Sequence, residues 1–85
     1  MRYSGVVCDF RTEDIFHAVG DSLKNVILTI DKLSGNEYGA NTCMGVIWDN
    51  STGGAVAQLI KESGYPRGVW VLEEDGVYLS EPCGG

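Results

Sequence analysis

The segment Ile47-Trp48-Asp49-Asn50-Ser51-Thr52 repeats, in residue class, the earlier segment Val7-Cys8-Asp9-Phe10-Arg11-Thr12. In each segment an apolar run ends at an Asp and is followed by a turn and by a Thr that suits a helix N-cap. The repeat predicts two copies of one unit, in which a strand leads into a helix and then into another strand.

The first unit is expected to occupy the first 33 residues. A short apolar run at 5–10 predicts its first strand, and alternating side chains at 25–33 predict its second. Between them, a helix is predicted over 12–24, because apolar residues recur along one helical face. These residues are Ile15, Phe16, Val19 and Leu23.

The second unit follows a polar loop at 34–41. It is predicted as a strand over 43–48, a helix over 53–63 and a strand over 68–73. Asp75-Gly76 is typical of a type I′ hairpin turn, and it predicts a further short strand over 77–79.

These elements predict one α+β domain over residues 1–85. The expected architecture is a two-layer split βαβ, the ferredoxin-like order βαββαβ, with an extra C-terminal hairpin strand. Right-handed crossovers would place both helices on one face of the sheet. The strands at 5–10 and 43–48 would then lie side by side and parallel in the middle of the sheet. Another two-layer α+β arrangement of the same elements is the alternative.

The charge balance restricts the classes of partner. Twelve acidic and six basic residues give a net charge of −6. This argues against direct binding of nucleic acid or of anionic membranes, which both require a basic surface. It permits a basic protein partner, although the charge can also serve solubility alone. Because the chain shows no membrane-spanning run and no signal-type segment at its start, a cytoplasmic location is expected.

Three cysteines, Cys8, Cys43 and Cys83, are widely spaced and form no C-x-x-C pair. This spacing argues against a zinc or redox motif, and free thiols are expected. No cofactor is predicted. His17, the single histidine, has no partner at catalytic spacing, so we expect a structural role for it.

Asp9 and Asp49 are the candidate metal ligands, because each ends a strand that was placed in the middle of the sheet. If those strands are parallel neighbours, the two carboxylates would be close enough to hold Mg²⁺ for phosphoryl transfer. The residues Val6-Val7-Cys8-Asp9 resemble the first strand of the small CRISPR-associated endonuclease-like proteins. That family consists of ferredoxin-like dimers with an Asp at this position, but the resemblance covers four residues and membership is not inferred. The alternative is that both Asp side chains form local turns.

An acidic and aromatic group is predicted on or near the C-terminal hairpin. Its members are Glu73, Glu74, Asp75, Tyr78 and Glu81. Such a group could bind a basic groove of a partner. Alternatively, its charges protect an edge strand from aggregation.

The sequence therefore favours a non-enzymatic acidic module that binds the basic surface of another protein or ribonucleoprotein. A virus-encoded inhibitor that blocks the nucleic-acid-binding site of a host nuclease or defence complex would have these properties. Two alternatives remain open. One is a small metal-dependent phosphodiesterase that uses Asp9 and Asp49, and the other is a self-associating structural domain, such as a homodimer.

Overall fold

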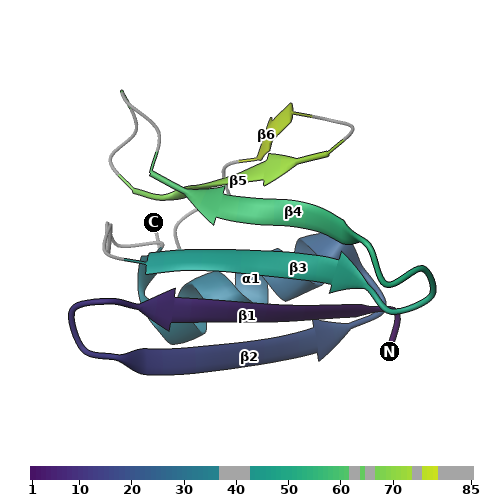
Figure 1. Ribbon diagram of the computed structural model, residues 1–85, viewed down its shortest axis with the longest axis horizontal. Coiled ribbons are helices and arrows are strands. Elements are labelled where there is room, and N and C mark those ends of the chain that lie inside the picture. The colour runs from purple at the N-terminus through teal and green to yellow at the C-terminus, as the bar shows by residue number, and fades with distance from the viewer. Residues whose placement is uncertain (37–42, 62–63, 65–66, 74–75, 79–85) are drawn as a thin grey trace.

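The computed structural model describes residues 1–36, 43–61, 64, 67–73 and 76–78. Within this part of the chain, a single antiparallel sheet packs against one helix (Figure 1). The elements are β1 (Tyr3–Asp9), β2 (Asp14–Gly20), α1 (Leu23–Ser34), β3 (Cys43–Asp49), β4 (Ala55–Ile60), β5 (Val69–Leu72) and β6 (Gly76–Tyr78).

The strands lie in the order β2-β1-β3-β4-β5-β6, and every neighbouring pair is antiparallel. β1 lies between β2 and β3, so α1 carries the chain from one side of β1 to the other. The expected contact between the first strand and the strand at 43–48 is confirmed, but the two strands run in opposite directions. The short strand that pairs with β5 after the predicted hairpin is also confirmed, as β6.

The predicted ferredoxin-like order with two helices is wrong. The segment predicted as the first helix contains β2, the segment predicted as the second strand is α1, and the segment predicted as the second helix contains β4. Both misassigned strands are short, and their apolar residues fit a period of two as well as a helical period. In the part of the chain that the structure describes, the sheet therefore has one helix on one face rather than two.

Local backbone geometry explains why no helix starts after Asp9. Glu13 has a φ of 64°, a left-handed conformation that a helix does not contain. Its backbone N–H donates to the Asp9 carbonyl at 2.7 Å and closes a tight turn. The chain therefore reverses, and β2 pairs with β1 along its whole length.

α1 carries the capping signals that identify a helix. Ser22 is its N-cap and accepts a hydrogen bond from the Asn25 N–H at 3.4 Å. Gly35 ends the helix with a φ of 76°, the left-handed conformation typical of a glycine after a helix. Val26, Ile27 and Ile30 are fully buried, so the apolar residues of 25–33 follow a helical period rather than the alternation of a strand.

The hydrophobic core lies between α1 and one face of the sheet. Val26, Ile27 and Ile30 from the helix belong to the same cluster of buried residues as side chains from the four central strands. These strand residues are Val7, Ile47, Ala57, Leu59 and Trp70. The helix lies close to the sheet at Gly5 and Gly20, where an added Cβ would lie 3.3 Å and 3.1 Å from Val26 of α1.

A buried polar network joins the end of α1 to β5. Asp31, Asn36 and Trp70 are each at most 1% exposed. The Asp31 Oδ1 accepts hydrogen bonds from Trp70 Nε1 at 2.9 Å and from Asn36 Nδ2 at 3.2 Å. Asn36 also forms hydrogen bonds with both backbone groups of Gly68. Its Nδ2 donates to the Gly68 carbonyl at 3.0 Å, and its Oδ1 accepts from the Gly68 N–H at 3.1 Å. The Asn36 side chain thus satisfies the backbone hydrogen-bonding groups of Gly68, directly before β5.

We predict that Asn36→Ala lowers the free energy of unfolding by about 2–4 kcal/mol, because it leaves buried polar groups of Asp31 and Gly68 without this partner. Urea unfolding followed by tryptophan fluorescence measures the change. The matched control is Asn25→Ala, at an exposed helix position, which should change the free energy by less than about 0.5 kcal/mol. Equal effects at both positions would contradict the role given to the network.

Candidate functional site

The two carboxylates proposed as metal ligands lie at opposite ends of the sheet. In the β1–β3 ladder, Asp9 pairs with Cys43, whereas Asp49 pairs with Tyr3. Six residues of extended strand separate these positions, which corresponds to about 20 Å. Because the two strands are antiparallel, Asp9 and Asp49 cannot share one cation, and the geometric basis of the predicted phosphodiesterase is lost.

Asp49 instead organises the turn between β3 and β4. Its Oδ1 accepts hydrogen bonds from the Ser51 N–H at 2.9 Å and from the Ser51 hydroxyl at 2.6 Å. Its Oδ2 accepts from Arg2 Nε at 3.2 Å and from Nη2 at 3.1 Å. The bonds from Ser51, and then the Arg2 guanidinium, hold the pKa of Asp49 below its usual value. Both oxygens therefore have structural partners.

Asp9 has the equivalent role at the other end of β1. Its Oδ1 accepts from the Arg11 N–H at 2.9 Å, which is the geometry of an Asx-turn. Among the described residues, no group of three or more His, Cys, Asp or Glu side chains is placed to hold a metal ion. The two repeated segments that suggested a catalytic pair are thus two turns of the same kind.

The acidic group near the C-terminal hairpin is described in part. Glu73 is exposed just after β5, and it lines two neighbouring hollows of the surface. Glu74, Asp75 and Glu81 lie outside the described residues, as does the side chain of Tyr78. The proposed role of these residues in partner binding remains a prediction.

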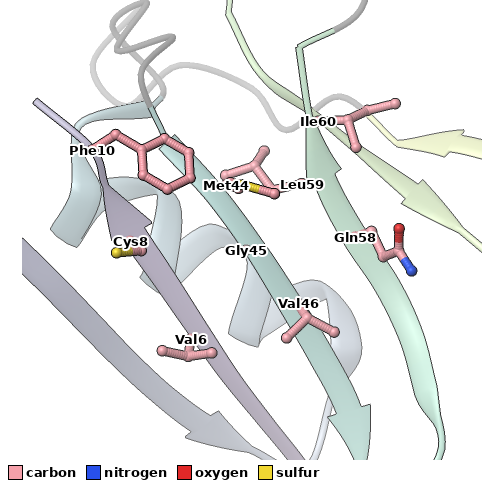
Figure 2. Close-up of a pocket in the computed structure, with 9 residues that line it drawn as sticks. All are labelled: Val6, Cys8, Phe10, Met44, Gly45, Val46, Gln58, Leu59 and Ile60. Carbon is pink, nitrogen blue, oxygen red and sulfur yellow. The ribbon is translucent and has the colours of Figure 1, made fainter.

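The most extended unassigned surface is the face of the sheet opposite α1, which we call the open face. We define it by the residues of β1 to β5 that alternate with the core positions. They are Ser4, Val6, Cys8, Ile15, His17, Val19, Met44, Val46, Trp48, Gln58, Ile60, Val69 and Val71. Val69, at the start of β5, is fully buried, so the exposed part of this face lies over β1 to β4. No described element covers this face, and α1 lies behind the sheet when it is viewed from this side (Figure 2).

The open face is mostly apolar, with Ser4, His17 and Gln58 as the polar members of its defining set. None of its defining residues is Asp, Glu, Lys or Arg, although 18 of the 85 residues of the chain are charged. Ile15, Val19 and Met44 are 59%, 57% and 53% exposed, and Ile60 is 36% exposed. Phe10, in the turn at the end of β1, is 61% exposed at the border of this face. Large apolar side chains normally avoid such exposure when they lie close together.

A hollow of about 390 Å³ lies in the middle of the open face, between β1, β3 and β4. Figure 2 shows the side chains around it, with Val6 and Cys8 on β1, Met44 and Val46 on β3, and Gln58 and Ile60 on β4. The ring of Phe10 stands at one end of the hollow, near Cys8 and Met44. The surface thus combines a shallow recess with projecting apolar groups, which suits contact with another apolar surface.

The two cysteines among the described residues lie on opposite faces of the sheet. Cys8 is half-buried on the open face, and Cys43 is buried on the helix side. Burial raises the pKa of the Cys43 thiol, and the neighbouring Asp9 carboxylate adds to the shift. Cys43 is therefore a poor nucleophile and acts as a small apolar core residue.

Sequence reasoning missed the open face, although a signal for it was present. Val6-Val7-Cys8 and Val46-Ile47-Trp48 are continuous apolar runs, which are typical of strands that are covered on both faces. The runs were taken to indicate a sheet interior. They equally predict that a strand with a helix on one side has an apolar surface on the other.

Comparisons with protein-family models, with curated proteins and with solved structures find no match to this chain. In the described residues, no helix has the length and apolar character needed to cross a membrane. The functional argument therefore depends on the geometry of the molecule itself.

We predict that Asp49→Asn destabilises the protein at pH 7 but has a smaller effect in acid. Because the pKa of Asp49 is lower in the folded chain than in the unfolded chain, its charged form stabilises the fold above the unfolded value of about 3.9. This stabilisation is lost as the pH falls through the folded pKa. Urea unfolding between pH 7 and pH 2.5 measures the difference.

The matched control is Asp14→Asn, which alters an exposed carboxylate at the start of β2. It should change stability little at either pH. A difference between Asp49→Asn and the wild type that stays constant across this range would contradict the structural role given to the Asp49 carboxylate.

Proposed function

We propose that this chain is a protein-binding module whose contact surface is the open face of its sheet. The observation that carries the proposal is the mostly apolar character of the sheet face opposite the helix, whose defining residues include no Asp, Glu, Lys or Arg. A sheet normally buries both of its apolar faces against other elements. A second protein surface would complete the layer that this chain leaves uncovered.

Burial of this face should contribute more binding free energy than burial of a polar surface of the same area. Each Å² of apolar surface removed from water stabilises the complex by about 25 cal/mol before the cost of association. Phe10, Ile15, Val19 and Met44 are each more than half exposed, so they can bury most of their area in a complex. Ile15, Val19 and Met44 lie on paired strands that hold their backbone rigidly, which limits the entropy lost on binding.

A basic protein or ribonucleoprotein is the second candidate partner. The exposed Glu73 and the net charge of −6 support it. With such a partner, the acidic residues near the C-terminal hairpin would contact its basic groups. They would then block its nucleic-acid-binding site, as an inhibitor does. Binding of this kind weakens as salt is raised, because the charges that meet are then screened.

We also propose a cytoplasmic setting for the module. Its support is the state of Cys8 and Cys43, which are both free thiols. Reducing compartments maintain thiols in this form.

We predict that a photo-crosslinking amino acid in place of Met44 forms adducts with another protein when the chain is expressed in the cells that produce it. Met44 is 53% exposed on the open face beside the hollow, so its substitute would be buried by a bound partner. Immunoblotting and mass spectrometry of the adducts measure the yield. A second copy of the chain counts as a partner in this experiment.

The matched control carries the same amino acid in place of Leu33, which is 51% exposed on α1, on the other side of the sheet. Its adduct yield should be several-fold lower. Equal yields at the two positions, or none at either, would refute the open face as the contact surface.

A further inference from the structure

We infer that the partner of the open face is a second copy of this chain, so that two sheets pack face to face in a symmetric dimer. The inference rests on the proposed function, because it names the occupant of the same surface. Two such chains would form four layers, with a helix on each outer side and both sheets inside. Face-to-face sheets pack about 10 Å apart and share one apolar layer.

The distribution of charge supports a copy of the same chain. Two molecules that each have a net charge of −6 repel one another wherever their carboxylates come close. The open face has no Asp or Glu among its defining residues, so two copies can meet there without opposed charges. The face also has no Lys or Arg that would select a partner of opposite sign. Its best complement is a surface that is equally uncharged and apolar, and its own copy provides one.

The size of the face is of the order that a stable dimer requires. The five strands have four to seven residues each. At a strand spacing of about 4.8 Å and a rise of about 3.3 Å per residue, they give a projected area on the order of 500 Å². The accessible area of projecting side chains is larger than this projection. Stable interfaces bury about 800 Å² on each partner, so the open face is of the right order.

The relief of the face is suited to two-fold symmetry. A symmetric interface brings the same patch from both molecules together, so each patch must supply projecting groups and the recess that receives them. The open face has both, because the hollow of about 390 Å³ lies beside the exposed side chains of Phe10 and Met44. Met44 projects from β3 next to β1 and β4, where a partner would cover it.

Sedimentation equilibrium of the purified chain tests the inference. At about 100 μM the wild type should have twice the 9.2 kDa mass of the chain. Met44→Lys should raise the dimer dissociation constant at least about tenfold, because each interface would then contain two unpaired buried charges. Leu33→Lys adds the same charge at the same exposure on the helix side, and it should leave the constant within about twofold.

Salt separates this dimer from a complex held by opposite charges. Raising NaCl from about 50 mM to about 500 mM should strengthen the dimer or leave it unchanged, because screening reduces the repulsion between two acidic molecules. Circular dichroism of both variants verifies that they are folded. If Met44→Lys does not fold, Ile15→Lys at the 59% exposed position on β2 replaces it.

A wild type that stays monomeric at this concentration would overturn the inference, and so would a dimer that survives Met44→Lys unchanged. A monomer that nevertheless forms crosslinks from position 44 to a different protein would overturn the dimer alone and leave the proposed function standing. A monomer without such crosslinks would overturn both.

Discussion

The hydrogen bond between the Asp31 carboxylate and the Trp70 indole fixes how the two halves of the molecule fit together. The two residues are 39 positions apart and both are at most 1% exposed. The hairpins of the sheet form from neighbouring strands, but the link between β5 and α1, which packs mainly against β1 and β2, needs a contact between distant segments. Asp31 and Asn36 supply it with directional bonds, which a purely apolar contact would lack. Because this network holds the helix on one face, the opposite face has no cover from the described chain.

The sequence was informative about strands and turns but not about the order of helix and strand. The strands around Val7, Ile47 and Trp70 could be predicted from apolar runs, whereas the antiparallel pairing of β1 with β3 could not, because the expected order made these strands parallel. The segment after Asp9 could not, because its apolar residues fit two periods and the left-handed Glu13 has no sequence signal comparable to that of a glycine. The 25–33 segment could have been assigned correctly from Ser22 and Gly35, since capping residues at both ends outweigh a short alternation.

The candidate site depended on strand direction, and that is why it could not be predicted from residue types. Asp9 and Asp49 have the same local chemistry in either direction, but antiparallel strands place them at opposite ends of the sheet. The open face has the reverse dependence. Its residues are mostly ordinary apolar ones, and they form one surface because antiparallel pairing brings alternate residues of β1 to β4 to the side of the sheet away from α1. Such a surface is a property of topology, and it contains no residue that stands out in the sequence.

Charge and apolar surface act together to select which contact between molecules is favourable. β2 is an edge strand, and its free backbone groups could pair with a strand of another molecule. However, Asp14 begins β2 and Asp21 follows it, so two such edges would bring carboxylates together. The acidic residues thus border the sheet at its β2 edge, and they penalise lateral association there. The uncharged open face is left as the surface on which burial of apolar groups is not opposed by charge, and this asymmetry favours contact between faces over contact between edges.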